Sequence, residues 1–417
     1  MDRSLHKWLS VAFFNLMLVG ALGCILRYKI AYSLPFVDQK FFLHAHSHFA
    51  FSGWVTQALM VLMIKYLCEK TLTNHFVKYR WILWANLITA YGMLFTFPFE
   101  GYALGSIIFS TASIFAGYFF AIGFWKDLNK VSKPSVEKLF FKAGLFFNVL
   151  SSIGPFTLAY LMATKSSFQN LYVAAIYFFL HFQYNGWFLF TCMGLFAWRL
   201  SVYGIPEKKL KLAYYLFVYA CVPAYFLSAL WIPMPRWIYI LVALAGLVQL
   251  AGWITILKSL KQQLAFLKTK VNSFTRILFI LCAVAYTLKL LLQAASAIPS
   301  LSYLTYGFRP IVIGYLHLVL LGVVSLFIAT YSITYNYFHL TKIKKTGVVI
   351  FVTGIIINEI FLLLQGVADL NYTSLPYMNE ALLFAAIILF LGLLFMNISI
   401  KGRSEANKNI SSSMPNQ

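Results

Sequence analysis

Eight histidines offer this chain its widest choice of chemistry, and their positions divide them into two sets. Three lie in loops or at the ends of apolar stretches, where water can solvate them: His6, His75 and His339. The other five lie inside long apolar stretches: His44, His46, His48, His181 and His317. An ionisable side chain surrounded by lipid is costly and usually contacts a cavity, a cofactor or a polar partner. Imidazoles in such a setting are typical ligands of transition metals and of haem iron.

Three apolar stretches carry these histidines at a similar distance from one end, namely 42–65, 171–198 and 310–334. If all three begin on the same side of a membrane, the helical rise of 1.5 Å per residue puts the imidazoles roughly 5–15 Å below that surface. Ligands of one metal or haem must converge in this way. Two imidazoles on one haem iron make a low-spin centre that transfers electrons. The alternative is that single histidines form hydrogen bonds between helices.

The histidines of the first stretch cannot all serve one site. His44 and His48 are four residues apart and share a helix face. His46 lies about 200° around the helix from His44 and points elsewhere. At most two of the three can therefore ligate the same ion.

The elements that hold these side chains follow from the composition. The chain has 417 residues, of which 61% are hydrophobic and 11% charged, and its mean hydropathy is +0.78. A soluble domain is about half apolar and a quarter charged, so a soluble enzyme is excluded. Crossing a bilayer takes about 20 apolar residues. The sequence predicts twelve such helices: 8–31, 42–65, 80–99, 103–125, 139–163, 171–198, 212–232, 237–257, 276–298, 310–334, 347–368 and 379–400.

The predicted fold is therefore all-α, a polytopic membrane protein with about twelve transmembrane helices in one bundle over residues 1–400 and a polar tail over 401–417.

The net charge is +22, and 26 of the 33 Lys and Arg residues fall in alternate loops. The positive-inside rule then predicts cytoplasmic N- and C-termini, in a bacterial inner membrane. The charge orients the protein in lipid, and we infer no nucleic-acid partner from it. The five cysteines form no Cys-x-x-Cys pair and are expected to be buried thiols.

Three short segments resemble a known family. They are His44-Ala-His46-Ser-His48-Phe-Ala-Phe-Ser-Gly53-Trp54 in the second predicted helix, His181-Phe-Gln-Tyr184-Asn-Gly186-Trp187 in the sixth and Gly314-Tyr315-Leu316-His317-Leu-Val-Leu-Leu-Gly322 in the tenth. Their order, depth and helix numbers resemble those of the catalytic subunit of haem-copper oxidases and nitric-oxide reductases (cytochrome c oxidase subunit I-like), with this chain as a divergent member.

The resemblance implies a role for each of these residues. His44 matches a ligand of the low-spin haem, and His48, one turn deeper on the same face, is the alternative. His317 matches the partner ligand of that haem. Tyr315 stands where the family has the histidine of the high-spin haem, and His181 matches the first copper ligand. The end of the seventh helix, Leu230-Trp231-Ile-Pro233-Met234-Pro235, lacks the family's remaining pair of copper-binding histidines.

These matches imply at least one haem, b-type or related, held by His44 and His317. Copper held by nitrogen needs about three imidazoles, and the expected place offers one. The expected role is electron transfer or an O2- or NO-related task in a respiratory chain, with a quinol or cytochrome donor or other respiratory subunits as partners besides membrane lipid. If the chain is an enzyme, it is an oxidoreductase. One alternative is a true terminal oxidase or nitric-oxide reductase with ligands such as His46, His48 or Tyr315; another is a haem-free, proton-coupled secondary transporter.

Haem propionates need cations close to the outer surface. Arg309 and Arg236 precede the tenth and eighth predicted helices on that side, and arginine pairs well with carboxylates. Deeper in the membrane, Glu359 and Lys289 are predicted either to relay protons or to pair with each other.

Overall fold

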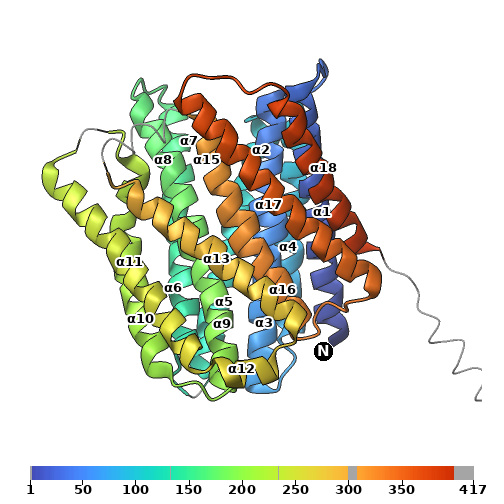
Figure 1. Cartoon of the computed structure of the whole chain (residues 1–417), viewed down its shortest axis with the longest axis vertical. Helices are drawn as coiled ribbons and strands as arrows, with labels where there is room; N and C mark the ends of the chain where they lie inside the picture. The colour runs from blue at the N-terminus through green and yellow to red at the C-terminus, as the bar shows by residue number, and fades with distance from the viewer. Residues whose placement is uncertain (1, 132, 233, 299–307, 399–417) are drawn as a thin grey trace, which may run out of the picture.

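The computed structural model describes residues 2–131, 133–232, 234–298 and 308–398. Every regular element in these residues is a helix, which confirms the all-α prediction (Figure 1). The first half of the chain forms α1 (Asp2–Ala31), α2 (Gln39–Phe49), η1 (Ala50–Thr56), α3 (Gln57–Thr71), α4 (His75–Glu100), α5 (Leu104–Lys130), α6 (Val136–Ser151), α7 (Ile153–Ala163), α8 (Gln169–His181), η2 (Phe182–Phe188) and α9 (Leu189–Val202). The second half forms α10 (Glu207–Cys221), η3 (Pro223–Ala229), α11 (Arg236–Gln262), α12 (Leu264–Lys270), α13 (Ser273–Ala295), α15 (Arg309–His317), η4 (Leu318–Ser325), α16 (Leu326–Thr334), α17 (Lys342–Leu370) and α18 (Met378–Asn397).

The length and apolar character of these helices are those of a polytopic membrane protein. Ten helices of the described ranges are long and apolar enough to cross a bilayer, or eleven if the bent pair Glu207–Cys221 and Pro223–Ala229 counts as one span. Each of the twelve predicted stretches coincides with helix over most of its length. The sixth, 171–198, is helical but is not among those ten, so the count of twelve stays a prediction. Residue 233 and the tail 401–417 lie outside the described residues.

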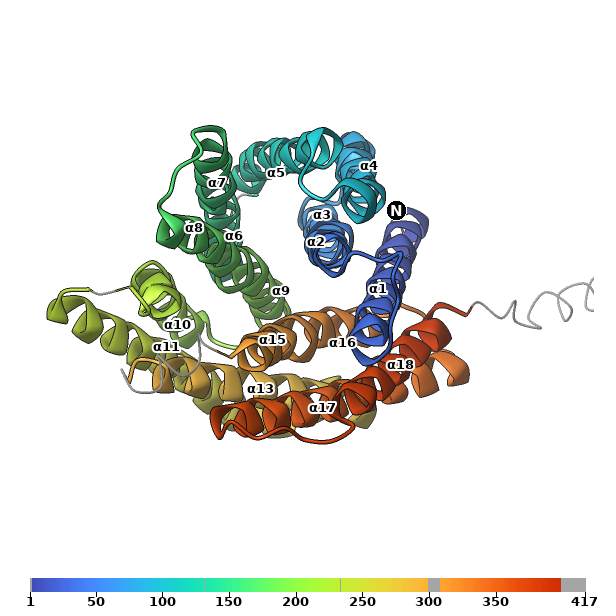
Figure 2. The ribbon, with the colours of Figure 1, turned by 90° about the horizontal axis from the view of Figure 1, so that it is seen from above.

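Three spans that carry the histidines are built differently from the others. Each begins as an α-helix, continues as a π-helix and ends as an α-helix: α2–η1–α3, α8–η2–α9 and α15–η4–α16. Seen from above, most of these three spans lies towards the middle of the bundle, with α8 at its outer edge beside α7, and we call them the inner spans (Figure 2). Nearly all residues of η1, α3, η2 and α9 are buried. The histidine layer is therefore carried by the inner spans.

Each π-helix starts directly after a histidine or two residues beyond it. η2 follows His181, η4 follows His317, and η1 begins two residues beyond His48. In each case a glycine stands five residues after the histidine: Gly53, Gly186 and Gly322. Short π-helical stretches inside α-helices are frequent at functional sites, because the extra residue redirects the side chains beside it.

Two tryptophans connect the three π-helices to one another. The indole Nε1–H of Trp54 in η1 donates to Ser325 Oγ in η4 over 2.8 Å. The indole of Trp187 in η2 donates to Thr56 Oγ1 in η1 over 3.4 Å. Trp54, Trp187 and Ser325 are each at most 1% exposed. A buried N–H without a partner is costly, so these bonds fix the mutual positions of the three inner spans.

A second polar cluster holds the same spans together at the face where the N-terminus lies. Arg199 in α9 donates from Nε to Tyr331 Oη in α16 over 3.0 Å and pairs from Nη1 with Glu69 Oε2 in α3 over 3.3 Å. Its Nη2 donates to Tyr337 Oη, and that hydroxyl donates to Glu69 Oε1 over 2.7 Å. The guanidinium also stacks between Trp198 and Tyr335, 3.8 and 4.0 Å from their ring centroids. The inner spans are thus joined at two levels.

Candidate functional site

His46 is the histidine of α2 that is turned towards α1. Its Nδ1 lies 3.1 Å from the carbonyl oxygen of Val19. A carbonyl can only accept, so Nδ1 carries the hydrogen and the lone pair of the ring is on Nε2. Gly23, one turn further along α1, leaves room for this ring: a Cβ there would lie 3.5 Å from His46 Cε1.

His317, the last residue of α15, has the same tautomer. Its Nδ1 lies 2.9 Å from the carbonyl oxygen of Ile313, so its lone pair is also on Nε2. His317 lies within electrostatic range of His46 and of Arg27. Neither Nε2 forms a hydrogen bond with any residue of the described ranges. An imidazole whose Nδ1–H is held by a carbonyl is prepared to give Nε2 to a metal.

Two arginines lie beside this pair of imidazoles. Arg27 in α1 is within electrostatic range of His46 and of Arg309 at the start of α15. No carboxylate in the described part of the chain forms a salt bridge with either guanidinium. Two like charges close together with no acid between them repel one another, and an anion placed between them would relieve that repulsion.

His44 and His48 face the other side of α2, towards α4 and Tyr102. The His48 ring stacks on Phe97 with centroids 4.6 Å apart, and the His44 ring meets Tyr102 edge-on at 4.6 Å. Tyr102 precedes α5, and burial raises its pKa to about 12, so its hydroxyl can donate to His48 Nε2 across 2.9 Å at neutral pH. His44 Nε2 is buried and has no hydrogen-bond partner among the described residues. The structure therefore groups His44 with His48 and Tyr102, and not with His317.

His181 is a buried histidine with both ring nitrogens occupied. Nε2 lies 2.9 Å from the carbonyl oxygen of Cys221, and Nδ1 lies 3.1 Å from Asn185 Nδ2. The side chain is 1% exposed. In this arrangement no lone pair of His181 is available to a metal.

Tyr315 lies two residues before His317 and points to another side of α15. Its ring contacts the ring of Tyr184 in η2, with centroids 6.3 Å apart. This contact joins α15 to η2, the π-helix that follows His181.

The remaining polar residues singled out from the sequence lie apart from the two imidazoles. Arg236 is exposed at the start of α11, which lies at the opposite edge of the bundle from α1 (Figure 2). Lys289 donates to Gln293 Oε1 over 2.5 Å, and Glu359 accepts from Asn358 Nδ2 over 3.2 Å. Within the described ranges no salt bridge joins Lys289 to Glu359.

The candidate site therefore consists of His46, His317, Arg27 and Arg309. Of these, sequence reasoning put His317 and Arg309 at the haem, held His46 as an alternative ligand and missed Arg27. The sequence signal that could have identified Arg27 is its position near the outer end of the first span, without an acidic neighbour in sequence. No three His, Cys, Asp or Glu side chains in the described ranges come close enough to hold a metal ion. A haem iron needs fewer protein ligands than such a metal ion, because two axial side chains complete its coordination.

Comparison with known proteins adds no assignment: no family model matches this chain, and no curated protein matches it significantly.

Proposed function

We propose that this membrane protein binds one haem, b-type or related, between α2 and α15, with His46 and His317 as its axial ligands. The proposal rests on one observation. Two imidazoles from distant parts of the chain lie within electrostatic range of each other, and each has Nδ1 held by a carbonyl and Nε2 without a partner in the described residues. Arg27 and Arg309 fit the two propionates, because they are cations within electrostatic range of each other that form no salt bridge in the described ranges.

The chain's own residues would orient the group and set its charge environment. The two carbonyls hold the imidazole tautomers, and the two guanidiniums neutralise propionates that would otherwise be costly to bury. When bound, the haem supplies a one-electron couple. A bis-imidazole iron has no open coordination position, so we propose electron transfer within a respiratory membrane as the principal role, with a quinol or a cytochrome as the donor.

A second metal centre is not part of this proposal. The only histidine at the position of the family's first copper ligand has both nitrogens hydrogen-bonded, to Cys221 and Asn185. A role in O2 or NO chemistry would need a different site, and the group of His44, His48 and Tyr102 is the alternative that a true oxidase or reductase would use.

We further propose a bacterial inner membrane as the location, with both termini in the cytoplasm. The positive-inside rule supports this orientation, because most Lys and Arg residues fall in the loops on the side of the N-terminus.

Absorption spectroscopy of the purified full-length chain, expressed with an adequate haem supply, tests the proposal. We expect a Soret band and, after reduction, the sharp α and β bands of bis-imidazole haem. His46→Ala and His317→Ala should abolish these bands. His44→Ala and His48→Ala are matched controls from the same helix, and they should retain the bands.

Three outcomes would contradict the proposal, each in a different way. Loss of the bands in His44→Ala with retention in His46→Ala would restore the ligand that the sequence motif predicts. A wild-type protein that folds but has no Soret band would point to a haem-free transporter. Copper in stoichiometric amount, or carbon monoxide binding by the reduced protein, would indicate a true oxidase or reductase.

A further inference from the structure

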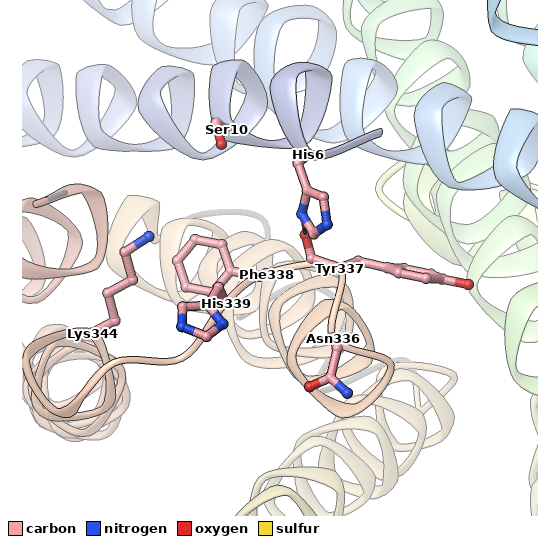
Figure 3. A pocket seen from close by; sticks show the side chains of 7 residues that line it. All are labelled: His6, Ser10, Asn336, Tyr337, Phe338, His339 and Lys344. Carbon is pink, nitrogen blue, oxygen red and sulfur yellow. Dashed lines mark hydrogen bonds between the residues drawn. The ribbon is translucent and has the colours of Figure 1, made fainter. Parts of the chain in front are cut away.

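A cavity of about 430 Å³ opens at the face where the N-terminus lies, between α1 and the segment that joins α16 to α17. His6 projects from α1 towards this segment, where Phe338 and His339 lie, and Lys344 reaches in from the first turns of α17 (Figure 3). His6 Nδ1 lies 2.9 Å from the carbonyl oxygen of Tyr337, which fixes the orientation of the ring. Three side chains that can carry positive charge therefore line one cavity.

A second cavity, of about 600 Å³, adjoins the first and is an open groove between α1 and α4. The two share His6 and Ser10, so they are adjacent along α1. Beyond that shared part, the cavity is lined by Lys7 and then by less polar side chains of α1 and α4: Val11, Phe14, Leu87 and Tyr91. Phe14 is 43% exposed. The two cavities together have a basic end near the membrane surface and an apolar end deeper down.

Among the described residues that line the two cavities there is no carboxylate. The Lys344 ammonium lies 4.5 Å from the ring centroid of Phe338, a cation–π contact that holds it beside the cavity without neutralising it. His6 donates from Nδ1, so a protonated ring can donate a second hydrogen bond from Nε2. An anion with several acceptor oxygens fits such a set of donors.

We propose that these cavities bind one anionic phospholipid, such as phosphatidylglycerol, from the leaflet on the side of the N-terminus. Its phosphate lies at the end formed by His6, His339 and Lys344, and one acyl chain lies in the groove between α1 and α4. Two observations favour a lipid over a soluble phosphate. The basic end adjoins an apolar groove, and both lie where helix ends meet the membrane surface. Basic pockets between transmembrane helices on the positively charged side are typical sites for anionic headgroups.

Native mass spectrometry of the full-length chain in detergent tests this site. The protein is titrated with dioleoyl phosphatidylglycerol and, separately, with dioleoyl phosphatidylcholine. We expect one tightly retained phosphatidylglycerol and weaker retention of phosphatidylcholine. Lys344→Gln should weaken retention of phosphatidylglycerol by about fivefold, the effect of about one surface cation on an anionic lipid. Lys344→Arg should restore it. Val11→Trp, which fills the groove, should also weaken retention of the lipid.

Lys345→Gln is the matched control, because Lys345 is the next residue of α17 but lies over Phe274, 4.9 Å from its centroid. It should retain phosphatidylglycerol as the wild type does. Equal retention of the two lipids, or equal loss in Lys344→Gln and Lys345→Gln, would overturn the proposal. So would displacement of the lipid by inorganic phosphate at millimolar concentration together with normal retention in Val11→Trp, since the site would then be one for free phosphate. Size-exclusion profiles confirm that each variant is folded.

Discussion

The choice between neighbouring histidines of one helix depends on what each ring meets. His46 contacts a carbonyl of α1 and lies within electrostatic range of Arg27, whereas His44, two residues earlier, packs against the aromatic rings of Phe97 and Tyr102. The spacing in sequence determines the angle between the two side chains around the helix axis. It does not determine how the whole helix is rotated relative to its neighbours. The motif match to His44 and the geometry around His46 therefore differ by that rotation, and the spectra of the four alanine variants decide between them.

Arg27 provides a prediction at the same scale. Arg27→Gln removes a positive charge close to the proposed haem, which stabilises the oxidised, more positive iron relative to the reduced iron. We expect the midpoint potential to fall by on the order of tens of millivolts and the haem content of the purified protein to decrease. Redox titration and haem quantification measure these changes.

Arg236→Gln is the control for that experiment. Arg236 is exposed on α11 at the far edge of the bundle, so neither the potential nor the haem content should change. An equal effect of the two substitutions would show that Arg27 acts only through the overall charge of the protein. A normal potential in Arg27→Gln would remove this residue from the site.

The elements that matter most are the three π-helices. A π-helical turn accommodates one residue more than an α-helical turn, so every residue beyond it is rotated relative to the residues before it. In this chain the turn follows the histidines in each inner span, and Trp54 and Trp187 bond across from one π-helix to another. Packing is close at the same places: a Cβ on Gly186 would lie 2.5 Å from Phe147 Cβ, and one on Gly53 would lie 2.7 Å from the Phe49 ring. The hydrogen bonds and the close packing therefore fix the positions of the three π-helices relative to one another.

Ser325→Ala tests the link between η1 and η4. It leaves the buried indole N–H of Trp54 without an acceptor, which should lower the free energy of unfolding by about 1–3 kcal/mol. Because η4 follows His317 directly, we also expect a change in the shape or position of the haem bands. Unfolding in mixed detergent micelles and absorption spectra measure the two effects.

Thr287→Ala makes the same chemical change elsewhere. It removes the acceptor of the Trp253 indole, whose bond of 2.8 Å joins α11 to α13. A similar loss of stability is expected, but with an unchanged haem spectrum. If both variants alter the spectrum equally, the π-helical junction has no special connection to the haem site.

At the scale of the whole molecule, the inner spans are joined twice and the outer helices wrap around them (Figure 2). One junction lies at the π-helices and the other at the Arg199 cluster on the face of the N-terminus. That face also contains other ion pairs between helix ends, such as Lys70 with Glu137 at 3.0 Å. Where an acid is near, basic residues on this face thus hold helix ends together.

Arg199→Gln is predicted to loosen the second junction. It removes the hydrogen bonds to Tyr331 and Tyr337 and leaves Glu69 without its arginine, so the free energy of unfolding should fall by about 1–3 kcal/mol. Arg199→Lys should recover only part of this loss, because an ammonium cannot stack between Trp198 and Tyr335 or donate in three directions within one plane. Detergent-induced unfolding measures both variants.

Arg276→Gln provides the comparison. Arg276 donates to Ser273 Oγ through an exposed hydrogen bond of 3.1 Å, and the loss of this bond should change the stability very little. Equal stabilities of Arg199→Gln and the wild type would mean that the cluster does not contribute to holding the spans together.

The sequence by itself determined the class of the protein, the positions of its helices and the set of candidate ligand residues. Apolar length and composition are local properties, and lipid requires every backbone group to be bonded within its own helix, so helices could be placed without knowing their neighbours. Only the tertiary structure decided which face of α2 His46 shares with α1, that Arg27 lies within electrostatic range of Arg309 and of the two imidazoles, that both nitrogens of His181 are hydrogen-bonded, and that π-helices follow the histidines. These facts depend on how each helix is rotated against its neighbours. That rotation is set by the packing of the whole bundle, which no single stretch of sequence contains.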